Sequence, residues 1–431
     1  MTLIVACPSE RFDRDGLVSC DLSRIYPFQP YRYTQKAGEL ADLVTQPYDK
    51  ISPTMRTRYL SLSPYNLVRV ILGERQPQDS ETENVYTRAA AFLRDWIESG
   101  ILAQDAEPGV FPYFQEFTVP DSGERLVRKG FIALGALEEY SAGIVHRHEQ
   151  TLLGPKKDRT ELLRATLAHF GQIFMLYPDP SRSIDSLLDE AAQAPPLAEL
   201  TDEYGVVHRL WKISDASQIQ QLMADKKLLI ADGHHRYETA LGIHRANPDM
   251  PGADRVMMTF VNMHSPGLKI LSTHRLVNGI PAENLPEGFL KAASTFFEVE
   301  KIESLDALQT SWTERPDRTI IGAAIGDRLF QLEERTARGA LDVIVLHETL
   351  LGKVLGISEE AVRDEKHLHY IRGMEQAVGE ARSGAAQIAF LLKPTAIEQV
   401  ASTSFSGGVM PQKSTDFYPK LLTGLAIYKL D

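Results

Sequence analysis

One stretch decides the fold of this sequence: Leu228-Leu229-Ile230-Ala231-Asp232-Gly233-His234-His235-Arg236-Tyr237-Glu238-Thr239-Ala240-Leu241. An apolar run ends in polar residues and resumes as an amphipathic pattern, which predicts a buried strand, a tight turn and a helix beginning near His234. Asp232 and Gly233 supply the turn, because glycine tolerates a positive φ and aspartate bonds its own downstream backbone. Since Tyr237, Ala240 and Leu241 recur at helical spacing, we expect that face to pack on the strand.

The start of this helix is a predicted anion site. Its first N–H groups lack partners within the helix, and the helix dipole favours negative charge. The alternative is that Asp232 only caps the helix and that His234 and His235 form a solvated rim. Four polar residues gather at one strand end, namely Asp232, His234, His235 and Arg236, and this favours a functional site over a simple cap.

Composition narrows the class of protein. The 431 residues carry a formal net charge of −12, with 43% hydrophobic and 24% charged residues, as in soluble globular proteins. The negative charge argues against binding to nucleic acid or to an anionic membrane. Cys7 and Cys20 form no CxxC motif, no secretory signature is present, and no apolar run approaches the roughly 20 residues of a membrane span. The sequence therefore predicts a cytoplasmic protein, and it leaves the oligomeric state open.

The order of expected elements predicts an α/β to α+β fold with mixed sheets, because helices alternate with strands along the chain. We expect an N-terminal α/β segment over residues 1–110, which includes a strand at 66–72, packing on the core. A central domain over residues 111–280 should open with a β-hairpin and carry the site. A C-terminal α/β domain over residues 281–431 should send its tail back to that site.

A second polar cluster follows the predicted hairpin. If the chain is extended here, the imidazoles of His146 and His148 share one side and Glu149 takes the other. Lys156 and Arg159 lie near the start of the next predicted helix, where cations oppose the dipole at about 0.3–1 kcal/mol unless an anion binds. A solvated pair of cations is the alternative.

A third cluster near the C-terminus resembles a phosphate loop at first sight. Gly407 and Lys413-Ser414 have the offsets of GxxxxGK[ST], but Gln412 replaces the second glycine and Pro411 removes a backbone donor. We reject a phosphate loop and keep as possible anion contacts Lys413, Ser414, Thr415 and Lys420. No GxGxxG or GxSxG motif supports a dinucleotide fold or a serine hydrolase.

The three clusters share an excess of basic side chains at element ends in an acidic chain, which suits phosphate recognition and phosphoryl transfer. Glu149, Asp232 and Glu238 are available as a base or as metal ligands. The adjacent His234 and His235 point about 100° apart on a helix and cannot together chelate one ion. Mg²⁺ carried with a nucleotide is favoured over a histidine metal centre, and the metal ligands remain unknown.

Three motifs together resemble a known family. They are Asp-Gly-His-His-Arg-Tyr-Glu-Thr-Ala at 232–240, His148-Glu149 followed by Gly154-Pro155-Lys156 and Asp158-Arg159, and residues 410–420. They are similar to the prokaryotic family catalogued as domain of unknown function 1015. The segment 213–240 also resembles the ParB/sulfiredoxin-like domain, including free serine kinases, where the matching turn and helix start hold nucleotide phosphates. The resemblance implies a nucleotide-phosphate or catalytic role for residues 232–236. The catalytic carboxylate of those kinases lies outside the matched segment.

The resulting hypothesis is a nucleotide-dependent phosphotransferase that uses ATP or ADP with Mg²⁺ on a small hydroxyl substrate, with free L-serine the first candidate. The alternatives are a ParB-like nucleotide-binding regulatory module and a metal-assisted hydrolase. The proposed catalytic residues are Asp232, His234, His235, Glu238 and Glu149. The proposed nucleotide or phosphate contacts are Gly233, Arg236, His146, His148, Lys156, Arg159, Lys413, Ser414, Thr415 and Lys420. Tyr48 and Asp49 are substrate candidates, for which an ordinary proline-flanked turn is the alternative.

Overall fold

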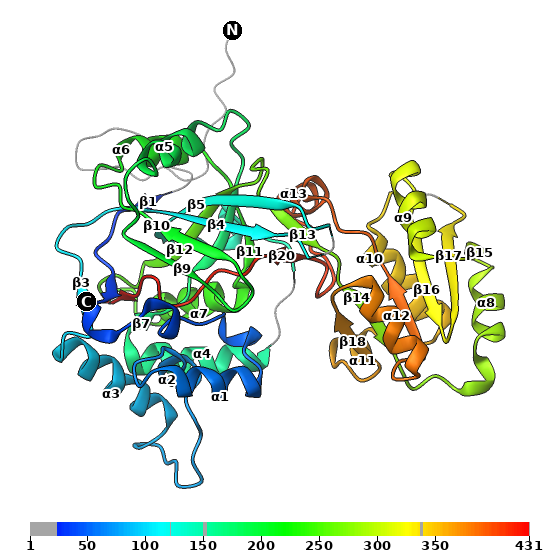
Figure 1. The fold of residues 1–431 in the computed structure, drawn as a ribbon, viewed down its shortest axis with the longest axis horizontal. Helices are drawn as coiled ribbons and strands as arrows, with labels where there is room; N and C mark the ends of the chain where they lie inside the picture. Colours follow the sequence, from blue (N-terminus) through cyan, green and yellow to red (C-terminus); the bar gives the residue numbers. More distant parts are fainter. Residues whose placement is uncertain (1–23, 121, 150–152, 337–338, 431) are drawn as a thin grey trace.

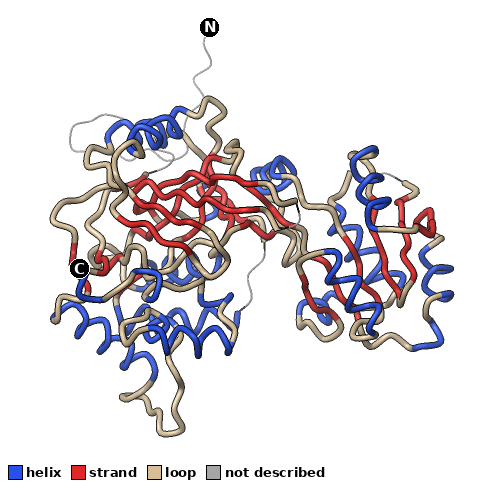
Figure 2. Tube along the Cα trace, viewed as in Figure 1, coloured by secondary structure: helices blue, strands red, loops and turns tan. Residues whose placement is uncertain are grey.

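The computed structural model describes residues 24–120, 122–149, 153–336 and 339–430. Figure 1 shows two lobes side by side, a larger first lobe with a curved sheet and a smaller second lobe with its own sheet. The chain crosses to the second lobe after residue 271 and returns to the first lobe near its end, so that the C-terminus lies in the first lobe. Helices and strands alternate in both lobes (Figure 2).

The first lobe is built on a nine-stranded mixed sheet. Its order is β6-β11-β8-β12-β5-β4-β10-β9, and β1 pairs with β5. Strand β11 is parallel to β6 and antiparallel to β8, and β12 is parallel to β8 and antiparallel to β5. The strands are β1 Ile25–Tyr26, β4 Phe111–Thr118, β5 Arg125–Ala136, β6 Val145–Arg147, β8 Ile173–Tyr177, β9 Ala198–Thr201, β10 Val207–Leu210, β11 Leu228–Asp232 and β12 Arg255–Asn262. The predicted mixed α/β class and the hairpin formed by β4 and β5 are confirmed.

The second lobe holds a six-stranded antiparallel sheet in the order β15-β17-β16-β19-β14-β18. Its strands are β14 His274–Val277, β15 Phe297–Ile302, β16 Ile320–Ile325, β17 Arg328–Glu334, β18 Leu368–Ile371 and β19 Ile388–Leu391. Its helices are α8 Glu287–Ala293, α9 Leu305–Glu314, α10 Asp342–Val345 with a π-helix Leu346–Val354, α11 Glu359–Arg363 and α12 Met374–Ser383. The division at residues 110 and 280 stays a prediction.

Helices cover the first lobe on several sides (Figure 1). They are α1 Pro53–Leu62, α2 Val68–Ile71, α3 Val85–Glu98, α4 Leu153–Thr166, α5 Ser183–Ala191, α6 Ser217–Met223, α7 His234–Ala246 and α13 Ile397–Phe405. Two-stranded pairs join β2 Tyr31–Tyr33 to β3 Leu102–Gln104, β7 Ala168–His169 to β21 Tyr428–Lys429, and β13 Lys269–Leu271 to β20 Asp416–Tyr418. No helix formed by the described residues has the length and apolarity needed to cross a membrane.

The strand predicted at 66–72 is wrong, since this segment forms helix α2. The Asn66 side chain accepts a hydrogen bond from the backbone N–H of Val68 at 2.9 Å and so starts a turn. Val68, Val70 and Ile71 are nevertheless all buried. A short apolar run buried on every side has no periodicity that separates a helix from a strand, which explains the error.

The two faces of the central sheet pack against different partners. In β8, Ile173, Met175 and Tyr177 belong to the same buried cluster as Tyr237 of α7. The alternate residues Phe174 and Leu176 belong to a second cluster, which also contains Met410 and Phe417 near the C-terminus. Side chains of a strand alternate between the faces, so the sheet lies between α7 and the C-terminal part of the chain.

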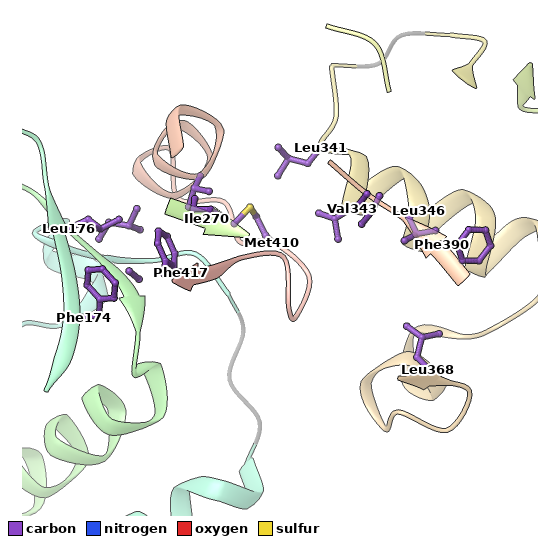
Figure 3. Packing of buried hydrophobic residues seen from close by; sticks show 14 of the residues in the cluster. Phe174, Leu176, Ile270, Leu341, Val343, Leu346, Leu368, Phe390, Met410 and Phe417 are labelled. Atoms are coloured by element: carbon purple, nitrogen blue, oxygen red, sulfur yellow. The ribbon is translucent and has the colours of Figure 1, made fainter. Parts of the chain in front are cut away.

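The second cluster continues from one lobe into the other. Figure 3 shows Phe417 beside Phe174 and Leu176 in the first lobe, with Leu341 and Phe390 of the second lobe in the same cluster. Met410 lies between these groups (Figure 3). Residues 410–420, here called the return segment, therefore form part of the core that joins the lobes.

Candidate functional site

The stretch Leu228–Leu241 folds as strand β11, a one-residue turn and helix α7, as predicted. Gly233 has φ of 93°, in the left-handed region that favours glycine. A Cβ atom at this position would also lie 3.1 Å from Nε of Arg236. The register of β11 against β8 shifts between Ile230 and Asp232, and such irregularities redirect side chains at strand ends. The turn thus presents Asp232 at the edge of the sheet.

Asp232 is held by two cations. Its Oδ2 accepts a hydrogen bond from Nη2 of Arg236 at 2.7 Å, and its Oδ1 lies 3.3 Å from Nζ of Lys420. Burial opposes ionisation of Asp232, but the charges of Lys420 and Arg236 outweigh it and lower the pKa of this carboxyl group. Arg236 also donates to the carbonyl oxygen of Gln172 at 2.7 Å. Asp232 is therefore a fixed carboxylate at neutral pH.

His148 has a defined orientation next to Glu149. Its Nδ1 lies 2.7 Å from the carbonyl oxygen of Ile230, which can only accept, so Nδ1 carries the proton. Its Nε2 lies 2.7 Å from Oγ1 of Thr415 and 3.5 Å from Oε1 of Glu149. Burial raises the pKa of Glu149, but the hydrogen bond and charge of His148 dominate and lower it to about 2. The backbone N–H of Ser414 donates to the same carboxylate at 3.2 Å.

His234 is the first residue of α7 and packs against His148. The two ring centroids lie 4.8 Å apart with an interplanar angle of 66°. Burial, together with the charge of His148, lowers the pKa of His234 to about 3. Among the described residues, no group forms a hydrogen bond with Nε2 of His234. This imidazole is therefore neutral at pH 7 and does not act there as a cation for phosphate.

Two buried arginines hold the ends of the return segment. Nη2 of Arg275 donates to the carbonyl oxygen of Lys413 at 3.0 Å, and Nη2 of Arg128 donates to that of Pro419 at 2.5 Å. Both side chains are 1% exposed, and burial lowers the pKa of each to about 10. Neither forms an ion pair with a carboxylate within the described ranges. Because unpaired buried charges are costly, we interpret both arginines as positioning residues for this segment.

A cavity of about 540 Å³ lies where the return segment, the start of α7 and the second lobe meet. Its first-lobe wall includes Asp49 and Lys50 from the 3₁₀ helix Tyr48–Lys50. Its second-lobe wall includes Tyr370 of β18 and the adjacent Arg372. The lining residues are Gln46, Asp49, Lys50, His148, Glu149, Asp202, Tyr204, Val206, Ala231, Asp232, His234, Thr273, Glu365, His369, Tyr370, Ile371, Arg372, Lys413, Thr415, Asp416, Tyr418, Pro419 and Lys420.

The cavity is strongly charged, with both signs present. Six carboxylates (Asp49, Glu149, Asp202, Asp232, Glu365 and Asp416) and four cationic side chains (Lys50, Arg372, Lys413 and Lys420) line it. Arg372 and Lys420 are engaged, because Asp416 forms a two-bond pair with Arg372 and lies 3.3 Å from Nζ of Lys420. Within the described part of the chain, Lys50 and Lys413 form no ion pair. Burial and the neighbouring charge of Lys420 lower the pKa of Lys50.

Several residues predicted for the site do come together. The cavity is lined by the predicted residues Asp49, His148, Glu149, Asp232, His234, Lys413, Thr415 and Lys420. These residues come from four separate stretches of the sequence. Ser414 supports them through its backbone bond to Glu149, and Gly233 provides the turn.

Other predicted residues lie elsewhere. Tyr48, Arg159 and Arg236 line a smaller neighbouring cavity of about 60 Å³, where the Arg159 guanidinium lies 4.1 Å from the centroid of the Tyr48 ring. Both ring nitrogens of His146 lie against carbonyl oxygens, at 3.1 Å from Ser404 and 3.0 Å from Gly143. The prediction that His146 and His148 share one side, with Glu149 on the other, is wrong, because His148 and Glu149 both line the cavity and His146 does not.

His235 and Glu238 of α7 do not line the cavity. Glu238 lies 3.9 Å from Nη1 of Arg147, whose guanidinium packs over the ring of Tyr140. The side chain of Lys156 falls outside the described residues. No group of three or more His, Cys, Asp or Glu side chains within the described ranges is arranged to hold a metal ion.

Several lining residues were not among those predicted from the sequence. Lys50 follows Asp49 directly, and Asp416 lies inside the C-terminal motif, so both could have been included. Asp202, Tyr204 and Arg372 follow no recognisable pattern. Asp202 and Tyr204 reach the cavity through the turn between β9 and β10, and Arg372 reaches it through the packing of the second lobe.

Comparison with known proteins places the chain in a family. The family model described as "Protein of unknown function (DUF1015)" matches residues 25–347, more than half of the chain. The chain belongs to the DUF1015 family. The resemblance noted in the sequence is thus confirmed for DUF1015, while the ParB/sulfiredoxin-like character of the segment around Asp232 stays a prediction. No curated protein matches the chain.

The solved structures that match this chain do so at low sequence identity and low TM-score. A free serine kinase in complex with AMP is 17% identical, covers 65% of this chain and 89% of its own, and has a TM-score of 0.37. A conserved hypothetical protein from Pyrococcus furiosus is 17% identical over 64% of this chain and 87% of its own, with a TM-score of 0.35. SbnI with a C-terminal truncation from Staphylococcus aureus is 10% identical over 68% of this chain and 87% of its own, with a TM-score of 0.36.

Proposed function

We propose that the cavity binds the phosphates of ATP or ADP together with Mg²⁺, and that the protein transfers a phosphoryl group to the hydroxyl of a small molecule. The observation that carries this proposal is the pair of ammonium groups on Lys50 and Lys413. Both line a polar cavity of about 540 Å³, and neither forms an ion pair with a described residue. Cations left unpaired in an acidic protein favour an anionic ligand, and hydrogen bonds from such groups to phosphate are strong.

The size of the cavity supports a ligand larger than inorganic phosphate. Pockets for small molecules and cofactors usually measure about 300–1,000 Å³, and this cavity of about 540 Å³ lies in that range. Its walls come from both lobes, which is a common position for such sites. We propose that the phosphates lie near Lys50 and Lys413.

The excess of carboxylates over basic side chains supports a divalent cation accompanying the nucleotide. Mg²⁺ is usually held by one or two carboxylates together with substrate phosphates and water, where it neutralises charge developing on the phosphoryl group. We propose Asp49 as the ligand, because its carboxylate forms no ion pair with a described residue and lines the cavity beside Lys50. Asp232 is already neutralised by Arg236 and Lys420.

We propose His148 as the base for the acceptor. The oxygen of the acceptor hydroxyl would attack the terminal phosphorus, the bond from phosphorus to the bridging oxygen would break, and the hydroxyl proton would pass to Nε2 of His148. The bond from Nδ1 to Ile230 leaves Nε2 to accept the proton, and the Glu149 carboxylate 3.5 Å away would stabilise the imidazolium formed. Free L-serine is the first acceptor to test, because the resemblance of segment 213–240 points to it.

The test is to incubate the protein with ATP, ADP or CTP, Mg²⁺ and L-serine, and to follow phosphoserine by ³¹P NMR. The proposal predicts phosphoserine with at least one nucleotide, and a rate reduced about 10²-fold or more in His148→Gln. Lys291→Ala, which removes an exposed ammonium group on α8, serves as the control and should leave the rate unchanged. Nucleotide binding without any product would contradict the transferase and favour the ParB-like module.

A further inference from the structure

We propose that Tyr204 is the residue on which the base of the bound nucleotide stacks. This inference rests on the proposed function, because it assigns the nucleobase end of the same ligand. Tyr204 lines the cavity, and its side chain is 60% exposed. An aromatic ring exposed at the edge of a polar cavity can bind a nucleobase, since every base offers a face for stacking.

The turn that carries Tyr204 is fixed by its neighbours. Oδ1 of Asp202 accepts hydrogen bonds from the backbone N–H groups of Tyr204 and Val206, each at 2.9 Å. The carbonyl oxygen of Asp202 accepts from Gly205 at 3.0 Å, and Gly205 has a φ of 77°, which glycine adopts readily. This short connection between β9 and β10 is therefore held in one conformation.

A buried polar network anchors the turn to the interior. Oδ2 of Asp202 accepts from Nε2 of Gln46 at 3.0 Å and lies 3.3 Å from Nε2 of His208. Nδ1 of His208 lies 2.7 Å from the hydroxyl oxygen of Tyr113, and both of these side chains are buried. A satisfied network of this kind rigidifies the segment it supports.

Of the residues in this turn, Tyr204 is the one that presents a large side chain to the cavity edge. The carboxylate of Glu203 accepts a hydrogen bond from the Tyr59 hydroxyl group, and Asp202 is occupied by its own network. The Tyr204 hydroxyl lies 3.9 Å from the sulfur of Met55 on α1, a contact at the tip of the side chain that leaves the ring faces uncovered. The fixed backbone of the turn therefore positions the exposed Tyr204 ring at the cavity edge, so that no rearrangement of the main chain is needed for stacking.

Arg372 lies at the same end of the cavity. Burial and the charge of Glu203 raise the pKa of Tyr204, and the nearby guanidinium of Arg372 opposes this rise. The Arg372 side chain is 45% exposed, so part of its surface is available for contact. Planar guanidinium groups also stack on nucleobases, so Arg372 can contribute to the same end of the ligand.

Calorimetric titrations with ADP and with pyrophosphate, both with Mg²⁺, separate the base from the phosphates. Tyr204→Ala should weaken ADP binding by about five- to a hundredfold and leave pyrophosphate binding unchanged, as expected for one lost stacking contact. Tyr204→Phe should retain ADP affinity. Leu197→Ala removes another large exposed side chain, 48% exposed and outside the cavity lining, and should change neither titration.

Equal ADP affinity in Tyr204→Ala and the wild type, or equal losses for ADP and pyrophosphate, would overturn the stacking role and leave the proposed function standing. If the wild-type protein binds neither ligand, both the proposed function and this inference fail. The high exposure of Tyr204 makes misfolding of the alanine variant unexpected, and a denaturation curve matching that of the wild type would show that the fold is retained.

Discussion

Replacing His234 by glutamine should make the protein less sensitive to mild acid. The imidazole is 9% exposed, and burial with the neighbouring charge of His148 lowers its pKa from 6.5 to about 3. Between these values the unfolded chain binds a proton that the folded chain does not bind. The contribution of the neutral His234 side chain to the free energy of unfolding is therefore complete above pH 6.5 and is lost as the pH falls toward 3.

The size of this effect follows from the shift. Between pH 6.5 and pH 5, about 1.5 pH units, His234 is protonated in the unfolded chain but not in the folded protein. At about 1.36 kcal/mol per pH unit, the free energy of unfolding falls by about 2 kcal/mol over this range. Urea denaturation at pH 7 and at pH 5 should show that His234→Gln loses about 2 kcal/mol less of its free energy of unfolding than the wild type does. His264→Gln, at an exposed position outside the cavity, is the control and should behave as the wild type. Equal losses in His234→Gln and wild type would refute the description of His234 as a buried neutral imidazole.

Three further predictions concern ligand binding and turnover. Lys413→Ala should weaken pyrophosphate binding about tenfold or more by calorimetry, because it removes a charge-assisted hydrogen bond, and unchanged affinity would place the phosphates elsewhere. Arg275→Met should produce a similar loss by releasing the carbonyl oxygen of Lys413 that Arg275 holds at 3.0 Å, and normal affinity in this variant would show that Arg275 does not position Lys413. Removing Mg²⁺ with a chelator should stop phosphoserine formation until Mg²⁺ is restored, and continued turnover without it would argue against the metal-nucleotide complex.

The sequence was most informative where local patterns are strong. The apolar run before Asp232, the glycine after it and the helical spacing of Tyr237, Ala240 and Leu241 predicted β11, the turn and α7, and the structure has each of them. Segment 66–72 has no such pattern, since its apolar residues are buried on every side, and its periodicity does not separate the helix that forms from the predicted strand.

For the site, the motifs identified single residues but not their orientation. His146 and His148 lie in one short motif, yet His148 lines the cavity while His146 bonds two carbonyl oxygens away from it. Helix periodicity likewise directs Glu238 toward Arg147 and away from the cavity. Arg372 could not be predicted, because it reaches the cavity only through the packing of the second lobe against the return segment. Which side chains share a cavity depends on long-range packing that local spacing does not encode.

The most direct test of the central claim is a crystal structure of the protein with ADP and Mg²⁺. The account predicts that the phosphates lie within hydrogen-bonding distance of Nζ of Lys50 and Lys413, between the return segment and the start of α7, with Mg²⁺ on Asp49. A nucleotide bound elsewhere, for example in the cavity of about 540 Å³ beside α8 in the second lobe, with Lys50 and Lys413 facing solvent, would contradict it.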